Sequence, residues 1–138
     1  SRLEMCCIAV EGMDKLRASD IEFSMPKPSY TIDTLDRLKE EHPELDFTLI
    51  VGADNWSNFH LWRQYERIIE ENKILIYPRL GEELLIDKKY SHNVRPCNAP
   101  ILQISSTFIR SSIKDGKCMS SFLPSGVYDY IVTHKLYR

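Results

Sequence analysis

Three observations predict an α/β fold for this chain, with an open parallel sheet and helices on both faces. Two apolar runs of strand length, 47–51 and 74–77, are continuous, as in parallel strands that are buried on both faces. Segments with apolar residues at helical spacing alternate with them, which is typical of a parallel sheet. Hydrophobic residues make up 43% of the 138 residues and charged residues 28%, enough for one core. The length predicts a single domain over residues 1–138.

In the first half of the chain, apolar residues at i, i+3, i+4 and i+7 predict an amphipathic helix over 2–13. Residues 21–23 are a short strand candidate, which a Pro-Lys-Pro segment follows. A second amphipathic helix is expected over 31–41. Ser29 or Thr31 can cap this helix, and a His-Pro pair ends it.

In the second half, the strand over 47–51 ends at Gly52-Ala53-Asp54. Apolar residues then recur at helical spacing from Trp62 up to Asn72, namely Trp62, Tyr65, Ile68 and Ile69. The elements expected after this segment are a strand over 74–77, a stretch that is mostly loop over 80–100, a strand over 101–104, a helix over 105–115 with Gly116 beyond its end, and a last helix over 127–134.

Charge and cysteine content exclude several classes of protein. The formal net charge of −2 argues against a general polyanion binder, so no nucleic-acid partner is predicted. No apolar run is long enough to span a membrane, and the first residues do not resemble a signal peptide. The four cysteines form no C-x-x-C pair, and no histidine lies at zinc-ligand spacing from them, so we expect reduced thiols in a cytoplasmic protein and no metal-ligating side chains. The chain begins with Ser1 and not Met, as expected of a processed or trimmed product.

The most informative stretch is 104–110, Ile-Ser-Ser-Thr-Phe-Ile-Arg, where hydroxyl residues follow a predicted strand and open a helix. The free N–H groups and positive dipole end of such a helix favour phosphate. Ser106 and Thr107 add hydroxyl donors, and Arg110 lies on the same helix face as Thr107. The sequence therefore predicts a phosphate-binding helix start. Simple N-capping, with Arg110 as a solvated residue, explains the same pattern.

Three other stretches could contact a nucleotide. Gly52 and Asp54 follow a buried strand, where ligands of open α/β sheets bind; Asp54 could accept hydrogen bonds from a ribose or could only cap a helix. Trp62 could stack on a flat ring or could be a core residue of a helix. Tyr30 and Thr31 lie at a hydroxyl-rich helix start, which alone indicates only a cap. The four histidines are scattered, and none is assigned to catalysis.

Taken together, these stretches resemble the ordered motifs of bacterial nicotinate-nucleotide adenylyltransferases. The resemblance covers essentially the whole chain, through segments 28–35, 50–54, Trp62, 104–110 and 123–137. The Ser-Ser-Thr-x-Ile-Arg element is shared by a wider nucleotidyltransferase superfamily. The Ser-Tyr-Thr-x-x-Thr-Leu element and the Gly-Ala-Asp…Trp element are typical of the nicotinate branch. The resemblance implies the Rossmann-like nucleotidyltransferase fold.

The resemblance also implies a reaction and a set of site residues. ATP and nicotinate mononucleotide would give deamido-NAD and pyrophosphate, in NAD biosynthesis, usually with Mg²⁺. The residues that it assigns to ATP are Gly52, Asp54, Ser105, Ser106, Thr107 and Arg110, with Thr107 and Arg110 also catalytic. It assigns Tyr30, Thr31, Trp62 and Arg79 to the mononucleotide.

One departure from the family is large. The H-x-G-H helix start that stabilises the transferring phosphate does not occur in these residues, nor do the family's first strands. We therefore expect an N-terminally incomplete domain that is inactive alone and poorly soluble, because buried strands would have open edges. A second hypothesis is a sister adenylyltransferase that uses pantetheine phosphate or FMN. Trp62 and the 29–35 element argue against this hypothesis. A nucleotide-binding module without catalysis is a third, which the missing histidines favour.

Overall fold

The computed structural model describes residues 1–138, which divide into two compact units. Unit 1 combines the two ends of the chain, Ser1–Ser24 and Gln103–Arg138, and unit 2 is Met25–Leu102. No helix in the chain is both long and apolar enough to cross a membrane.

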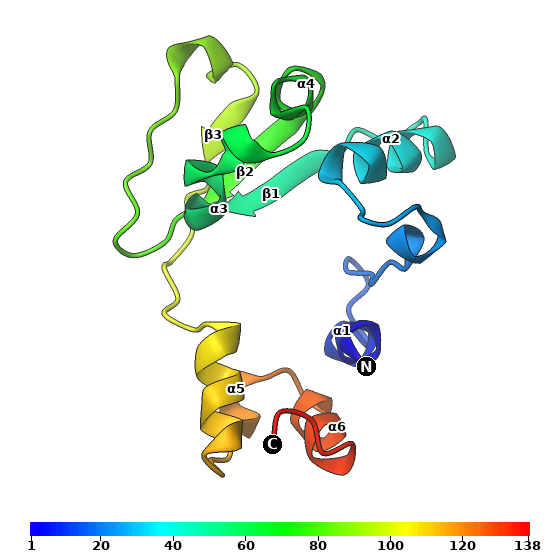
Figure 1. Ribbon diagram of the computed structural model, residues 1–138, viewed down its shortest axis with the longest axis vertical. Coiled ribbons are helices and arrows are strands. Elements are labelled where there is room, and N and C mark those ends of the chain that lie inside the picture. The colour runs from blue at the N-terminus through cyan, green and yellow to red at the C-terminus, as the bar shows by residue number, and fades with distance from the viewer. The chain divides into compact units, whose positions relative to one another are not determined.

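The sheet belongs to unit 2 and confirms the predicted parallel arrangement. Its strands are β1 (Thr48–Gly52), β2 (Lys73–Tyr77) and β3 (Val94–Pro96), in the order β1-β2-β3, and both strand pairs are parallel (Figure 1). The register aligns Gly52 with Tyr77, so β1 and β2 end at the same edge of the sheet. Ile50, on the edge strand β1, is 67% exposed, so the expectation of burial on both faces is wrong for this residue.

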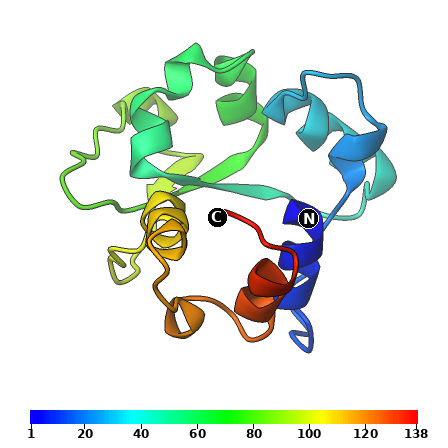
Figure 2. The same cartoon turned by 60° about the horizontal axis from the view of Figure 1, so that its bottom comes forward.

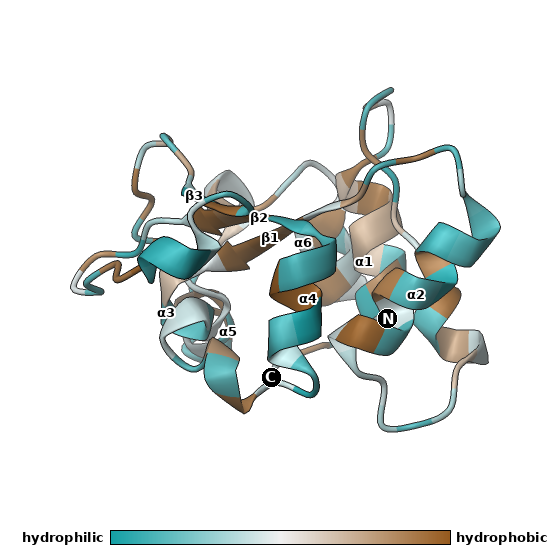
Figure 3. Cartoon of the chain, turned by 90° about the horizontal axis from the view of Figure 1, so that it is seen from above, coloured by the Kyte–Doolittle hydropathy of each residue, from teal (hydrophilic) through white to brown (hydrophobic).

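Five helical elements accompany the sheet in unit 2: α2 (Thr31–Glu41), α3 (Ala53–Ser57), α4 (Tyr65–Glu71) and the 3₁₀ turns η2 (Phe59–Leu61) and η3 (Lys88–Tyr90). In Figure 3, the central residues of β1 and β2 are hydrophobic, whereas α2 and α4 alternate between polar and apolar faces. Their apolar faces join the strands in a core of Ile32, Leu35, Val51, Ala53, Phe59, Ile68, Ile69, Ile74, Ile76 and Val94. The predicted helix 31–41 is thereby confirmed.

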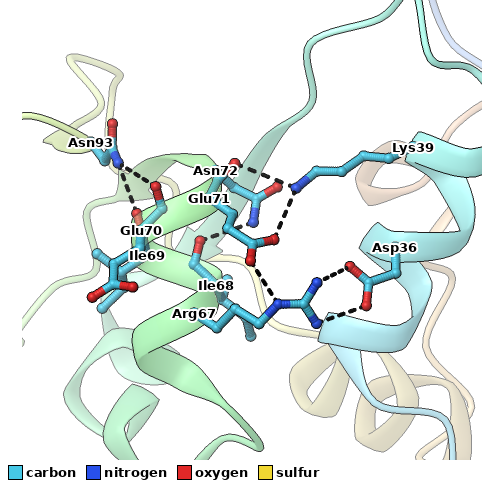
Figure 4. Close-up of polar contacts among 9 residues, drawn as sticks. All are labelled: Asp36, Lys39, Arg67, Ile68, Ile69, Glu70, Glu71, Asn72 and Asn93. Carbon is cyan, nitrogen blue, oxygen red and sulfur yellow. Dashed lines mark hydrogen bonds and ion pairs between the residues drawn. The ribbon is translucent and has the colours of Figure 1, made fainter.

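An ion-pair network joins α2 to α4 (Figure 4). The Arg67 guanidinium donates two hydrogen bonds to the Asp36 carboxylate, at 2.8 and 2.9 Å, and a third to Glu71 at 2.7 Å. The hydrogen bonds to Asp36, followed by the one to Glu71, raise the pKa of Arg67. Lys39 lies 3.6 Å from the same Glu71 carboxylate. The bidentate geometry fixes the orientation of α2 against α4 as well as their contact.

Unit 1 is helical and contains α1 (Arg2–Ala9), α5 (Ser106–Lys114), α6 (Val127–Thr133) and the 3₁₀ turns η1 (Ile21–Ser24) and η4 (Ser120–Phe122). α1 packs beside α6 (Figure 2), and the Tyr130 hydroxyl donates a 2.9 Å hydrogen bond to the Glu4 carboxylate. The chain ends are thus joined within one unit. The predicted helices over 2–13, 105–115 and 127–134 are confirmed, with the first one shorter.

Helices α5 and α6 end in the same Schellman pattern. In α5 the residue with positive φ is Gly116, as its sequence position predicts, and in α6 it is Lys135, with φ of +53°. The closing hydrogen bonds run from Gly116 to Ile113, Lys117 to Ser112, Lys135 to Val132 and Leu136 to Ile131.

Two strand predictions are wrong. Residues 21–23 form the 3₁₀ turn η1, because no strand pairs with them. Residues 101–104 also have no strand partner and no regular structure, and Leu102 is 60% exposed. The third strand is instead Val94–Pro96, within the stretch predicted as mostly loop. It forms because Val94 pairs with Ile74 of β2.

Candidate functional site

The carboxyl ends of β1 and β2 bring together Gly52, Asp54 and Arg79. Gly52 is the last residue of β1 and the N-cap of α3, and Asp54 lies in the first turn of that helix. Arg79 follows the end of β2, and its Nε lies 3.6 Å from Oδ1 of Asp54. Both side chains are about half exposed, so this pair stabilises the fold by less than ~1 kcal/mol. Its charges therefore remain available to a ligand.

Glycine at position 52 gives space to neighbouring side chains and is not needed for the backbone conformation. Its φ of −72° and ψ of 153° suit any residue. However, a Cβ atom there would collide with Oδ1 of Asp54 and would lie 3.4 Å from Nε of Arg79. The missing side chain thus leaves room for the Asp54–Arg79 pair at the strand ends.

A second group of predicted residues lines a pocket of about 210 Å³ in unit 2. Tyr30 and Thr31 come from the start of α2, where Tyr30 is the N-cap, and Trp62 comes from the segment between η2 and α4. The remaining lining residues are Ser29, Leu61, Arg63 and Ile68. The structure therefore brings together Tyr30, Thr31 and Trp62, which are far apart in sequence, and places Arg79 with Asp54 at the strand ends.

Trp62 lies just before α4 and not within the helix that its spacing predicts. Its backbone is extended, with φ of −74° and ψ of 145°, and the helix begins at Tyr65. Its ring lies 4.7 Å from that of Phe59, whose other neighbour is Trp56 at 5.0 Å. Trp62 thus packs against the core while also lining the pocket. The two roles considered for it, core residue and ring platform, are compatible in this position.

Arg63 is a pocket residue that the sequence analysis missed. Its guanidinium carbon lies 4.7 Å from the centroid of the Tyr30 ring, and its Nη1 lies 3.8 Å from Oδ2 of Asp33. The only sequence signal was a basic residue next to the proposed stacking tryptophan. Helical periodicity could not show its direction, because Gln64, the next residue, adopts a left-handed conformation with φ of +51°.

The helix start predicted to bind phosphate lies in unit 1. Ser105 is the N-cap of α5, and its hydroxyl accepts a 3.1 Å hydrogen bond from the Phe108 amide. The amides of Ser106 and Thr107 have no intrahelical acceptor, as in any first helical turn. Arg110 donates a 3.4 Å hydrogen bond to the Thr107 hydroxyl, and both residues are exposed to solvent. Capping accounts for Ser105, whereas Thr107 and Arg110 form a cationic, hydroxyl-bearing face at the helix start.

The chain has no cluster of three or more His, Cys, Asp or Glu side chains that could hold a metal ion. All four cysteines are free thiols.

Curated relatives match nearly all of the chain, although no protein-family model matches it. A protein of Bacteroides fragilis named "Probable nicotinate-nucleotide adenylyltransferase" is 49% identical over 132 residues, which cover 95% of this chain and 65% of the relative. A protein of the same name from Flavobacterium johnsoniae is 46% identical over 138 residues, which cover 99% of this chain and 72% of the relative. The chain thus spans about two thirds of the length of these relatives.

Solved structures show the same fold. A Vibrio parahaemolyticus protein assigned as a nicotinate-nucleotide adenylyltransferase superposes with a TM-score of 0.73, at 22% identity, over 99% of this chain and 69% of that protein. A Plasmodium falciparum nicotinic acid mononucleotide adenylyltransferase complexed with NaAD has a TM-score of 0.62 at 25% identity, over 79% of this chain and 57% of that protein. The predicted Rossmann-like nucleotidyltransferase fold is confirmed.

Proposed function

The chain belongs to the nicotinate-nucleotide adenylyltransferase family, and from this premise we propose that the protein transfers the adenylyl group of ATP to nicotinate mononucleotide. The phosphate oxygen of the mononucleotide forms a bond to the α-phosphorus of ATP, and the bond from that phosphorus to the bridging β-phosphate oxygen breaks. The products are deamido-NAD, an intermediate of NAD biosynthesis, and pyrophosphate. The observation that carries this proposal is the 46% identity over 99% of the chain.

We assign the pyridine ring of the mononucleotide to the pocket that Tyr30, Thr31 and Trp62 line. Its volume of about 210 Å³ is below the range of about 300–1,000 Å³ for drug-sized ligands, so it suits a single ring. Trp62 offers an aromatic face that its contact with Phe59 holds in place. Tyr30 and Thr31, which also line this pocket, are hydroxyl-bearing residues.

We assign ATP to two groups of residues, each within its own unit. In unit 2, Asp54 would accept hydrogen bonds from the nucleotide, and Gly52 would allow it to approach the strand end closely. In unit 1, the phosphates would bind at the start of α5, through Ser105, Ser106, Thr107 and Arg110. Thr107 and Arg110 would stabilise the charge that develops on the transferring phosphate. Arg79 pairs with Asp54, so its proposed contact with the mononucleotide competes with this ion pair.

Mg²⁺ would reach this site with the nucleotide. Magnesium is usually bound by one or two carboxylates together with substrate phosphates, and not by a cage of protein ligands. The half-exposed Asp54 is a carboxylate of the required kind at the strand ends, and no cluster of three ligands stands there. The ion would neutralise the negative charge of the phosphates.

We also propose a cytoplasmic location, since the four cysteines are free thiols.

The test is turnover by the full-length protein with ATP and four acceptors: nicotinate mononucleotide, nicotinamide mononucleotide, pantetheine phosphate and FMN. We expect deamido-NAD and pyrophosphate in equal amounts, with nicotinate mononucleotide the best acceptor. A faster reaction with pantetheine phosphate or FMN would contradict the proposal.

A polypeptide of these 138 residues alone is a useful comparison in this assay. It contains no H-x-G-H segment, so we expect it to show no turnover. Measurable formation of deamido-NAD by this polypeptide would mean that the residues described here are sufficient for catalysis.

A further inference from the structure

Arg63 stands out among the residues of the Tyr30–Trp62 pocket because it is the only charged one. The other lining residues are uncharged, namely Ser29, Tyr30, Thr31, Leu61, Trp62 and Ile68. In a small binding pocket, a charged side chain helps to fix which ligand binds and in which orientation.

The structure holds Arg63 loosely. Its guanidinium lies over the Tyr30 ring at 4.7 Å, and its distance of 3.8 Å from the Asp33 carboxylate is too long for a hydrogen bond. The Arg63 side chain is 52% exposed and that of Asp33 is 44% exposed, so water screens this pair. A guanidinium has five N–H donors in a planar fork. These donors are therefore available to an anion that enters the pocket.

The backbone next to Arg63 is strained. Gln64 adopts a left-handed conformation, with φ of +51° and ψ of 41°, which a residue with a side chain rarely adopts. This turn ends the extended segment that carries Trp62 and starts α4 immediately afterwards. It therefore keeps Arg63 beside Trp62 at the pocket instead of on a surface of the helix. Such strain is often found at ligand sites.

We propose that Arg63 is a specificity-determining residue that selects a pyridine ring carrying a carboxylate over one carrying a neutral amide. This inference rests on the proposed function, which places the pyridine ring on Trp62. Arg63 and Trp62 both line this pocket, so the guanidinium fork can reach a carboxylate on a ring stacked on Trp62. A bidentate bond to that carboxylate replaces the weak contact with Asp33. Asp33 lowers the selectivity by partly neutralising Arg63 in the empty pocket.

The experiment compares kcat/KM for nicotinate and nicotinamide mononucleotides in the full-length protein and in its Arg63→Gln variant. We expect the ratio of the two values to fall roughly tenfold, because a hydrogen bond to a charged group is lost. The ratio falls because KM for nicotinate mononucleotide rises, whereas kcat/KM for nicotinamide mononucleotide does not change. Arg63→Lys keeps the charge without the fork and should give an intermediate ratio. Asp33→Asn should raise the ratio about twofold, because it removes the competing carboxylate.

Arg37→Gln is the matched control. Arg37 is an equally exposed arginine on α2, pairs with Glu41 and does not line the pocket. This variant loses the same charge and should keep the ratio of the unmodified protein. Thermal unfolding of each variant shows whether the fold is retained.

Two outcomes overturn the inference, and they are distinguishable. If the unmodified protein prefers nicotinate and Arg63→Gln keeps that preference, or lowers both values equally, Arg63 only supports Tyr30 and the proposed function stands. If the unmodified protein does not adenylylate nicotinate mononucleotide at all, the proposed function is wrong, and the inference falls with it.

Discussion

At the residue scale, Trp62 has both a packing role and a proposed binding role. It contacts Phe59 in the core and lines the Tyr30 pocket, so its substitution affects both stability and substrate binding. Trp56 contacts the other side of Phe59 without lining the pocket, and its Nε1 donates a 3.0 Å hydrogen bond to the Leu85 carbonyl. The two tryptophans therefore form a natural comparison.

Replacing Trp62 with Ala is expected to raise KM for nicotinate mononucleotide roughly 5- to 150-fold, because stacking of one ring on an aromatic side chain is worth ~1–3 kcal/mol. KM for ATP should change little. Steady-state kinetics with each substrate varied in turn provides the measurement. Trp56→Ala is the control, and it should lower the unfolding temperature without raising KM. An equal rise of KM in both variants would show that loss of packing explains the effect.

The helix start at Ser105 could be recognised from sequence, whereas the binding role of its residues could not be. The sequence predicted a helix start with hydroxyl side chains at 105–107, and the structure confirms the helix and the Ser105 cap. Whether the remaining amides bind phosphate is a separate matter, which stays a prediction. Arg63 is the opposite case. Its position next to Trp62 was the only sequence signal, and the direction of its side chain could not be predicted because it depends on one left-handed residue, Gln64.

At the scale of elements, α6 ends at a conformation that glycine would adopt more easily. Lys135 has φ of +53° at the position that Gly116 occupies after α5. A left-handed conformation costs a residue with a Cβ atom ~1–2 kcal/mol. Lys135→Gly should therefore raise the free energy of unfolding by up to about 1 kcal/mol, as measured by urea denaturation.

The control for Lys135→Gly is the same replacement at Lys114, the last residue of α5. There the backbone is helical, and glycine should lower the free energy of unfolding by about 1 kcal/mol. If Lys135→Gly also destabilises the protein, the closing turn of α6 would not be strained as described.

The elements that sequence predicted are those whose pattern is local. β1 and β2 are continuous apolar runs, and α2 and α5 have both periodicity and recognisable ends. β3 has only three residues, including Pro96, and is a strand because β2 offers it a partner. Residues 101–104 have strand composition without a partner. In both cases, whether the segment forms a strand depends on a partner strand elsewhere in the chain, which the local sequence cannot show.

At the scale of the whole molecule, unit 1 is built from the two ends of the chain. The Glu4–Tyr130 hydrogen bond and the contact of α1 with α6 join segments separated by all of Met25–Leu102. Closing a flexible loop of ~80 residues costs about 4 kcal/mol, whereas a folded unit 2 already restricts the distance between its ends. Unit 1 should therefore be stable only while unit 2 is folded. We therefore propose that the two units fold together as a single domain.

Hydrogen exchange of the full-length protein can test this dependence. The amides of Ile131 in α6 and Ile76 in β2 are both in buried residues, one in each unit. We expect both to exchange by global unfolding, with the same free energy and the same dependence on denaturant. If Ile131 exchanged with a higher free energy than Ile76, unit 1 would be stable without unit 2, and the proposal would be wrong.

The aromatic row Trp56–Phe59–Trp62 has a spectroscopic consequence. It contains both tryptophans of the chain, so all of the intrinsic indole fluorescence comes from unit 2. The Trp56 indole is held by the Leu85 carbonyl, whereas the Trp62 indole borders the pocket assigned to the pyridine ring. One emitter therefore serves as an internal reference and the other as a sensor. Binding of a pyridine nucleotide would quench only part of the emission, and its spectrum would give occupancy without any added label.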